Sequence, residues 1–253
     1  MPLPIRVNRL SHMFPTTVVN AAHRRSLNVR AGGVALLAFL LMAGLSNGAS
    51  AQDRRQNEPG KFDYFLLVLS WSPSFCAANA ERGERRGASD PQCGPRPYSF
   101  VVHGLWPQYE RGFPEFCQVP APRLNRNIVS SMFDLMPSPN LIFHEWDRHG
   151  TCSGLSAGAY FEDIRKARAK IKIPPAYLEV TTPLTVSADE VKDAFVAANP
   201  GLPEDGISVD CDSRRLNEIR ICLSRDFGFR DCPEVARRSC RRDKLVMPPV
   251  RGG

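Results

Sequence analysis

The sequence predicts an α+β fold, a single domain with a central, mainly antiparallel β-sheet flanked by helices and held by four disulfides. Two observations predict it. Apolar runs of strand length and segments with helical spacing of apolar residues occur along residues 52–253 without a regular alternation, which is typical of α+β folds. The same stretch contains all eight cysteines and no internal repeat.

Four segments are predicted to be strands. Residues 62–71 (FDYFLLVLSW) form a continuous apolar and aromatic run, which is typical of a central strand covered on both faces. A loop is expected over residues 77–97. Residues 98–102 predict a second strand that turns at Gly104 and Pro107, so that His103 is expected at its end. Residues 206–211 and 218–223 are the last two predicted strands.

Three segments are predicted to be helices. Apolar residues at helical spacing predict residues 123–136 and residues 157–171. The inward-facing residues of the second segment are expected to be Tyr160, Ile164, Ala167 and Ile171. A third helix begins at the capping box Ser187-Ala188-Asp189-Glu190 and ends at Asn199-Pro200-Gly201.

The first 51 residues have the features of a signal peptide. Five arginines and no carboxylate precede a 12-residue apolar run at 34–45, and Ala49-Ser50-Ala51 offers a small-residue cleavage site. The run is shorter than the roughly 18 residues that a membrane-spanning helix needs. We therefore expect cleavage after Ala51, a loose segment over residues 52–60, and one domain over residues 61–253. The domain is expected to be periplasmic or secreted and free of the membrane, by the Sec or the twin-arginine route.

Loss of the leader changes the charge. The net charge falls from +7 to +2, because five positive and no negative charges leave with residues 1–51. A strong polybasic surface for tight, sequence-independent binding of nucleic acid is therefore not predicted for the mature protein as a whole. The local cluster Arg237-Arg238 with Arg241-Arg242 is more simply explained as a solvated charge run.

The eight cysteines predict disulfides rather than a metal site. Their number is even, they follow an export signal, and no Cys-x-x-Cys spacing or four-ligand zinc set occurs among them. Their spacing does not decide the pairing, since eight cysteines allow about 105 combinations.

The only three histidines after the leader lie in two short motifs. These are residues 100–108 (FVVHGLWPQ), with His103, and residues 144–152 (HEWDRHGTC), with His144 and His149. Histidine has an unperturbed pKa of about 6.5 and can both give and take a proton near neutrality. A single histidine is more often structural, but three in two motifs indicate acid–base chemistry.

The second motif has a functional face if it is helical. Helical spacing then brings His144 close to Arg148, and Glu145 close to His149, on one side. Such a face can bind an anionic phosphate and move protons. The zinc-protease signature His-Glu-x-x-His is the competing interpretation, but here the histidines are five residues apart, and no metal is expected.

The two motifs together resemble those of the RNase T2 family, F-x-x-H-G-L-W-P and H-E-W-x-K-H-G-T-C. The resemblance implies a secreted, metal-independent and cofactor-free ribonuclease of T2-like fold over residues 61–253. In the reaction of this family, the ribose 2′-hydroxyl of the RNA attacks the neighbouring phosphodiester and gives a 2′,3′-cyclic phosphate, which can then open to a 3′-phosphate. DNA lacks this nucleophile and is not expected to be cleaved.

The resemblance also implies a role for each motif residue. His149 is expected to be the base, His103 the acid that protonates the leaving 5′-oxygen, and His144 the residue that holds the phosphate. Glu145 and Arg148 are expected to stabilise the transition state. Arg148 replaces the family's usual lysine, so a planar guanidinium with several N–H donors takes the place of a compact ammonium group.

Two residues of the first motif are expected to contact a base. Trp106 matches the family's stacking tryptophan, although a core tryptophan beside a strand end is an equally good interpretation. Gln108 stands where some members have an aspartate that recognises adenine, so that purine preference should be relaxed or altered. Trp146 is expected to pack in the core, away from the functional face.

The resemblance implies four disulfides, Cys76–Cys93, Cys117–Cys152, Cys211–Cys240 and Cys222–Cys232. The leading hypothesis is a monomeric, low-specificity endoribonuclease that acts on single-stranded RNA. The alternative is a catalytically inactive, disulfide-linked secreted module of the same fold that binds RNA or protein.

Overall fold

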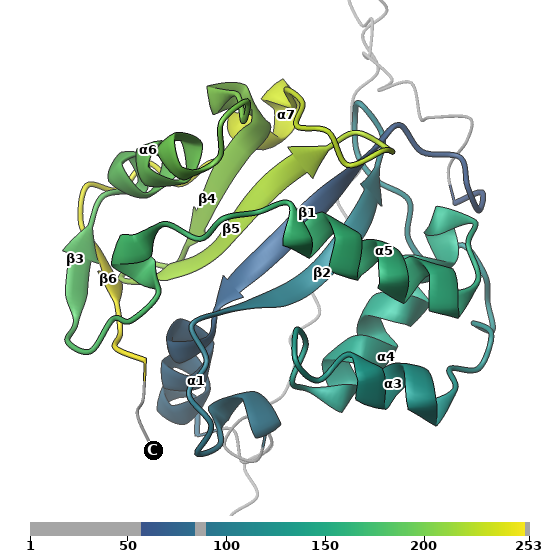
Figure 1. Cartoon of the computed structure of the whole chain (residues 1–253), viewed down its shortest axis with the longest axis horizontal. Coiled ribbons are helices and arrows are strands. Elements are labelled where there is room, and N and C mark those ends of the chain that lie inside the picture. Colours follow the sequence, from purple (N-terminus) through teal and green to yellow (C-terminus); the bar gives the residue numbers. More distant parts are fainter. Residues whose placement is uncertain (1–56, 84–89, 251–253) are drawn as a thin grey trace, which may run out of the picture. The chain divides into compact units, whose positions relative to one another are not determined.

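Strand β1, Tyr64–Trp71, is the buried strand around which the sheet is built in the computed structural model, which describes residues 57–83 and 90–250 (Figure 1). It lies between β2, Phe100–Gln108, and β5, Leu216–Leu223, and the edge strand β4, Ile207–Cys211, follows β5. All three pairings are antiparallel. The predicted α+β fold with a mainly antiparallel sheet is therefore confirmed. The expected signal peptide and residues 52–56 lie outside the described residues.

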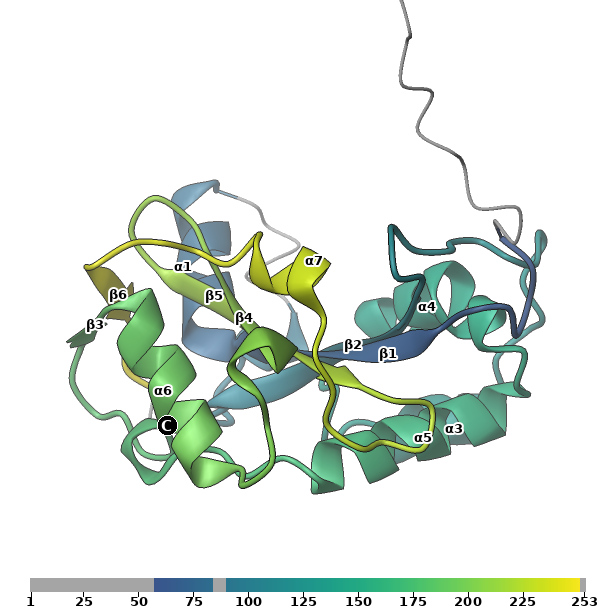
Figure 2. The same ribbon diagram turned by 90° about the horizontal axis from the view of Figure 1, so that it is seen from above.

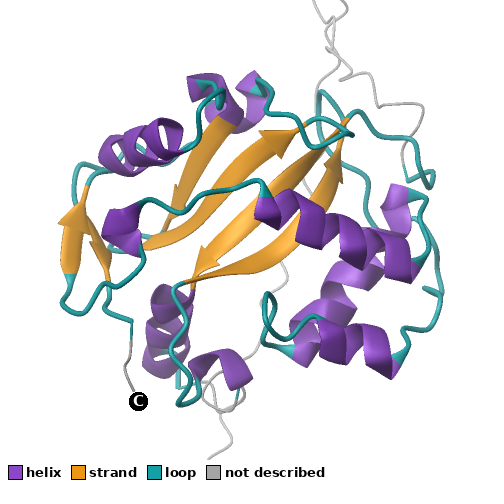
Figure 3. Ribbon diagram, in the orientation of Figure 1, coloured by secondary structure: helices purple, strands orange, loops and turns teal. Residues whose placement is uncertain are grey.

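Helices cover the sheet and gather at its β2 edge. Helix α5, Ala157–Ala169, contacts β1 and β2, while the shorter α3, Arg126–Ser131, and α4, Pro139–Arg148, pack beside it (Figure 3). Helix α6, Ala188–Ala198, lies against β4. The remaining short elements are α1 (Ser72–Glu81), α7 (Pro233–Ala236), the pair of strands β3 (Leu184–Val186) and β6 (Leu245–Met247), and single 3₁₀ turns at Pro91–Cys93, Gly150–Ser153, Pro175–Tyr177 and Glu204–Gly206.

The expected helical faces are found in α5 and α6. Tyr160, Ile164 and Ala167 of α5 and the following Ile171 are all buried. Helix α6 has the complete capping box, because the Ser187 hydroxyl accepts from the Glu190 N–H and the Glu190 carboxylate accepts from the Ser187 N–H.

Three expectations about boundaries are wrong. Strand β2 does not end before His103 but continues to Gln108, through the residues expected to turn. The helix predicted over residues 123–136 covers only Arg126–Ser131, because residues 132–135 form turns, in which the N–H groups of Met132 and Leu135 donate to carbonyls three residues back. The loop expected from residue 77 is partly the helix α1, which begins directly after β1 with Pro73 in its first turn.

The two faces of the sheet have different roles. One face is packed by Phe65, Leu67 and Leu69 of β1 in the main core, on the side of α5. The other face carries Tyr64, Leu66 and Val68, which pack with the disulfide Cys222–Cys232 near α7. Figure 2 shows α5 and α7 on opposite sides of the sheet. Trp106 of β2 and Val235 of α7 pack against this second face.

A β-bulge places His103 on this second face. Leu69 pairs with Val102 and Val68 pairs with Gly104, so that His103 is an extra residue of β2 without a partner on β1. A bulge of this kind redirects a side chain while the flanking residues keep their pairing. Val102 and Leu105 therefore both stay in the main core, and His103 faces the other side.

Four disulfides connect the described residues. They are Cys76–Cys93, Cys117–Cys152, Cys211–Cys240 and Cys222–Cys232, the pairs implied by the resemblance. Between residues 57 and 250, apart from 84–89, no helix has the length and apolar character needed to cross a membrane.

Candidate active site

A cavity of about 330 Å³ lies where β2, α4 and β5 meet on the second face of the sheet. All seven sequence-predicted catalytic and base-contacting residues line it: His103, Trp106 and Gln108 from β2, and His144, Glu145, Arg148 and His149 from α4 and its end. Phe113, Arg220 and Arg238 also line it. Helix α4 therefore presents the mixed acid, imidazole and guanidinium face that its spacing predicts.

His103 is held from the side opposite to α4. Its Nδ1 atom lies 2.5 Å from Oε1 of Glu218, a carboxylate on β5. Its Nε2 atom points the other way and lies 3.5 Å from Oε1 of Glu145. Burial alone would lower the pKa of His103, but the hydrogen bond and the charge of Glu218, with the charge of Glu145, raise it above 6.5. The structure thus favours a protonated ring.

Glu145 is the most deeply buried charged group of the site, with no exposed surface. Its Oε2 accepts a 2.7 Å hydrogen bond from the indole N–H of Trp106, and its Oε1 has no hydrogen-bond partner among the described residues. Burial raises the pKa of Glu145 to about 7, against the lowering effects of His103 and Trp106. Its charge therefore changes near neutral pH.

Trp106 connects the two motifs. Its ring stacks on the imidazole of His149, with centroids 4.9 Å apart and planes 22° apart, and meets the ring of His103 edge-on at 5.4 Å. The guanidinium of Arg220 lies 5.8 Å from its centroid. Gly104 is required for this arrangement, because a Cβ at that position would overlap the Glu145 carboxylate and the Trp106 indole nitrogen.

His149 is the residue that ends α4. Its backbone N–H donates to the Glu145 carbonyl at 3.0 Å, and only 5% of the residue is exposed. Burial, with the positive charges of Arg148, His144 and His103, lowers the pKa of His149 to about 3. Its Nδ1 has no hydrogen-bond partner within the described part of the chain. The imidazole is therefore neutral throughout the neutral pH range, and a neutral imidazole has one ring nitrogen that can accept a proton.

His144 and Arg148 lie one turn apart at the open side of the cavity. His144 is exposed, and its pKa is lowered by partial burial, by Arg148 and by His103. Arg148 forms a 2.8 Å ion pair with Glu115 and lies 5.8 Å from the ring centroid of Phe116. These two side chains can both reach a phosphate in the cavity, although Arg148 must then share its charge with Glu115.

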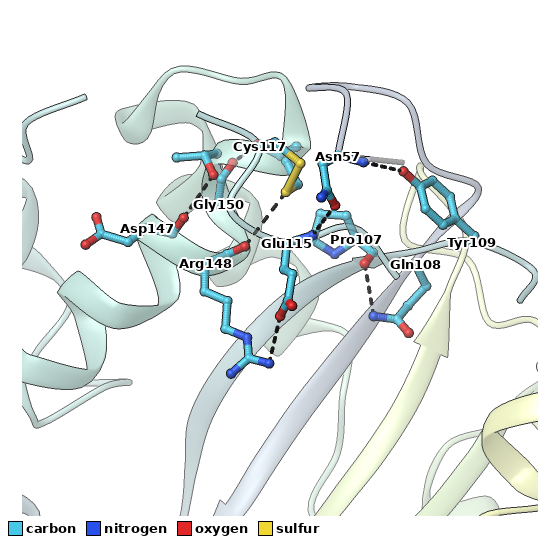
Figure 4. Close-up of a disulfide and its surroundings, with 12 residues drawn as sticks. Asn57, Pro107, Gln108, Tyr109, Glu115, Cys117, Asp147, Arg148 and Gly150 are labelled. Atoms are coloured by element: carbon cyan, nitrogen blue, oxygen red, sulfur yellow. Dashed lines mark hydrogen bonds and ion pairs between the residues drawn. A yellow bond between two sulfur atoms is a disulfide. The ribbon is translucent and has the colours of Figure 1, made fainter. Parts of the chain in front are cut away.

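Residues 109–121 are fixed to the end of α4 (Figure 4). The disulfide Cys117–Cys152 joins them to the turn after His149, and the Phe116 N–H donates to the Arg148 carbonyl at 2.8 Å. The Glu115 N–H donates to the Asn57 side chain at 3.1 Å. The structure therefore has a physical connection between this loop, the Glu115–Arg148 pair and His149.

The other two residues singled out from the sequence have distinct positions. Gln108 is buried at the end of β2, and its amide nitrogen donates to the Pro107 carbonyl at 2.9 Å. Trp146 lies in the core, 2% exposed, with its indole N–H bound to the Pro122 carbonyl at 2.7 Å. The expectation that Trp146 packs in the core is confirmed.

Sequence reasoning missed the contributions of β5. Glu218 and Arg220 are 115 or more residues from His103, yet register brings them to the cavity, since Ser70 of β1 pairs with Glu218 and Val68 pairs with Arg220. A signal was present, because two charged residues interrupt the apolar sequence LNEIRICL of β5 on the same face. Arg238, part of the basic cluster attributed to a solvated charge run, also lines the cavity.

Comparison with known proteins gives one family and several relatives. The model of the Ribonuclease T2 family matches residues 62–232, which include both motifs and β5. A protein named ribonuclease from Aeromonas hydrophila is 35% identical over 208 residues, which are 76% of this chain and 84% of that protein. A probable ribonuclease from Haemophilus influenzae is 32% identical over 185 residues, or 70% of this chain and 63% of that protein. The solved structure of RNase NT in complex with 5′-AMP has a TM-score of 0.57 and 26% identity, and the match covers 74% of this chain and 98% of that one.

Proposed function

This chain belongs to the ribonuclease T2 family and is an endoribonuclease, and from this premise we propose how its residues cleave RNA. The ribose 2′-hydroxyl of single-stranded RNA attacks the adjacent phosphorus, and the bond to the 5′-oxygen breaks. The product is a 2′,3′-cyclic phosphate, which water can open to a 3′-phosphate. No metal or cofactor takes part in this scheme.

The observation that best supports this proposal is the contrast between two histidines on one cavity. His149 has its pKa lowered to about 3 and is neutral, as a general base must be. His103 has its pKa raised and is protonated, as a general acid must be. His149 therefore takes the proton of the 2′-hydroxyl, and His103 gives a proton to the leaving 5′-oxygen.

The remaining polar residues act on the phosphate. His144 and Arg148, at the open side of the cavity, hold the phosphoryl oxygens, and Arg148 does so as a planar donor in place of the family's usual lysine. Glu145 lies between Trp106 and His103 and stabilises positive charge on the imidazoles during the reaction. Because the nucleophile is the 2′-hydroxyl, DNA is not a substrate.

Base recognition is weak in this proposal. Trp106 and Gln108 line the cavity and contact the base, but one face of the Trp106 ring is stacked on His149 and the Gln108 amide donates to its own strand. These internal contacts limit what the two residues can offer to a particular base. A low-specificity enzyme follows.

The protein is proposed to be an exported monomer, periplasmic or secreted and not bound to the membrane. Four disulfides and the absence of a free cysteine among the described residues support an oxidising compartment.

Product analysis on short, defined RNAs tests the proposal. In excess chelator, the protein should give cyclic phosphate ends from RNA and leave the matching DNA intact, and His103→Phe and His149→Phe should each lower the rate by about a hundredfold or more. Loss of cleavage in chelator would contradict the metal-free scheme. RNA binding without cleavage under all conditions would favour the inactive module.

A further inference from the structure

Glu218 makes the shortest polar contact of His103. Its Oε1 atom lies 2.5 Å from Nδ1 of the imidazole, and Ser70 lies between the two strands that carry them, with its hydroxyl 3.3 Å from Glu218 Oε1 and 3.4 Å from His103 Nδ1. The sheet register explains the contact. Ser70 pairs with Glu218 on β5, and the bulge of β2 places His103 on the other side of Ser70.

The second oxygen of Glu218 is fixed as well. Oε2 accepts hydrogen bonds from Nε and Nη2 of Arg220, at 3.1 and 2.8 Å, and Arg220 also pairs with Asp210 of β4 at 3.2 Å. The carboxylate is thus held between Arg220 on one side and His103 on the other. The residue is only 9% exposed, and although burial alone would raise the pKa of Glu218, the contacts with His103 and Arg220 lower it to about 2.

A charged carboxylate only accepts hydrogen bonds, so the nitrogen that faces it must carry a proton. Nδ1 of His103 is therefore the donor to Glu218. Nε2 is the other ring nitrogen, and it points toward Glu145 and the cavity, where the leaving group of the proposed reaction would lie.

We propose that Glu218 is a positioning residue that makes His103 the general acid, by holding its Nδ1–H and directing its Nε2–H at the leaving 5′-oxygen. This inference rests on the proposed function. As the bond between phosphorus and the 5′-oxygen breaks, the Nε2 proton moves to that oxygen, and His103 becomes neutral while its Nδ1–H stays bound to Glu218. The carboxylate neither gains nor loses a proton.

The other charged groups around His103 do not supply this function. Glu145 faces Nε2, the nitrogen whose proton must pass to the leaving group, and the charge of Arg220 on β5 opposes protonation of His103. On the α4 side, His144 and His149 both have lowered pKa values and do not favour the imidazolium of His103 either. Glu218 is the group that favours the imidazolium from the Nδ1 side.

Two substrates that differ in the leaving group test the inference. A dinucleoside monophosphate needs protonation of its leaving 5′-oxygen. The leaving group of a nucleoside 3′-(4-nitrophenyl phosphate) is 4-nitrophenolate, which is stable without a proton. Glu218→Gln should lower kcat/KM on the dinucleotide by about tenfold to a hundredfold, because the variant loses part of the rate enhancement that the general acid supplies. On the nitrophenyl ester, kcat/KM should change less than about threefold. Equal losses on both substrates, or no loss on either, would overturn the inference.

The pH dependence gives a second readout. Glu218→Gln removes the charge that raises the pKa of His103, so the high-pH limb of kcat/KM on the dinucleotide should move to lower pH. The NMR titration of the His103 Cε1–H signal should move in the same direction. An unchanged titration would contradict the assigned role even if activity fell, since a merely structural change would leave that pKa in place.

Two controls keep this result separate from the proposed function. Glu81→Gln removes a carboxylate that pairs with Arg214 and Arg215 away from the cavity, and both substrates should be cleaved at the normal rate. His103→Ala should lose activity on the dinucleotide and keep most of it on the nitrophenyl ester. If His103→Ala cleaved the dinucleotide normally, the proposed acid itself would be wrong, whatever Glu218 does.

Discussion

The indole nitrogen of Trp106 donates a 2.7 Å hydrogen bond to Glu145, and this bond joins the strand motif to the helix motif at the bottom of the cavity. The carboxylate has no exposed surface, and its other oxygen faces His103 at 3.5 Å. Trp106 is therefore more than a surface for stacking, since it stabilises the charged form of a carboxylate that burial would otherwise keep protonated.

Replacement of Trp106 by Phe should remove this donor while an aromatic ring still covers His149. We expect kcat/KM to fall by roughly tenfold to a hundredfold, because a hydrogen bond to a charged group is worth about 1.5–3 kcal/mol. Loss of the bond raises the pKa of Glu145, so the low-pH limb of activity should move upward. Trp146→Phe is the matched control. It also loses an indole hydrogen bond, but it should change only stability, and a normal pH profile in Trp106→Phe would contradict the assignment.

Gly104 should tolerate no side chain. A methyl group there would overlap both members of the Trp106–Glu145 pair, so Gly104→Ala should lose most activity and about 1–3 kcal/mol of unfolding free energy through overpacking. Gly158→Ala in α5 provides the comparison, since its Cβ would have only Ile128 nearby, at 4.0 Å. It should keep full activity, measured per folded molecule. Wild-type turnover in Gly104→Ala would show that the pair can move without consequence.

The parts of the fold that were predicted depend on local patterns. The apolar run of β1 and the spacing of Tyr160 and Ile164 in α5 are properties of neighbouring residues, and both are buried as expected. The sequence does not predict the end of β2 correctly, because Pro107 is typical of turns, whereas β2 is an edge strand, where proline is tolerated.

In the candidate site, too, the residues that local spacing places were predicted, and those that depend on strand pairing were not. The face of α4 follows from helix geometry, so His144, Glu145 and Arg148 could be placed together from their spacing. Glu218 could not be linked to His103, because that contact depends on the bulge in β2 and on the register of β5, which are set by pairing between distant segments.

Glu145 should make the protein less stable as the pH rises. In the unfolded chain its pKa is near 4.5, and in the folded protein it is about 7, so between these values unfolding releases a proton. The stability contribution is complete below pH 4.5 and is lost as the pH rises through about 7, by up to about 3 kcal/mol at 1.36 kcal/mol per pH unit. Glu145→Gln, which cannot ionise, should therefore unfold at a higher temperature than the wild type at pH 8.

The comparison of the two proteins across pH isolates the contribution of this residue. Thermal unfolding from pH 4 to pH 9 should give a difference in unfolding free energy that is small at pH 4 and favours Glu145→Gln above pH 7. The variant should also lose activity, because a neutral amide cannot stabilise positive charge on the imidazoles. A difference that does not vary with pH would mean that Glu145 ionises normally in the folded protein.

The disulfide Cys117–Cys152 should support activity as well as stability. It closes a segment of 35 residues and fixes residues 109–121 to the turn that follows His149. We expect the double variant Cys117→Ala/Cys152→Ala to lose about 2–5 kcal/mol of unfolding free energy. Its kcat/KM should also fall at temperatures where it is fully folded, because Glu115 would no longer hold Arg148, and Phe113 would no longer be fixed beside the cavity.

The disulfide Cys211–Cys240 offers a control of similar span, since its cysteines are 29 residues apart and neither lines the cavity. Its double alanine variant should lose a comparable unfolding free energy but keep the wild-type kcat/KM when folded. The two variants would then separate a general loss of stability from a loss of order at His149 and Arg148. Normal turnover in the folded Cys117→Ala/Cys152→Ala protein would mean that the hydrogen bond from Phe116 to Arg148 holds the loop without the disulfide.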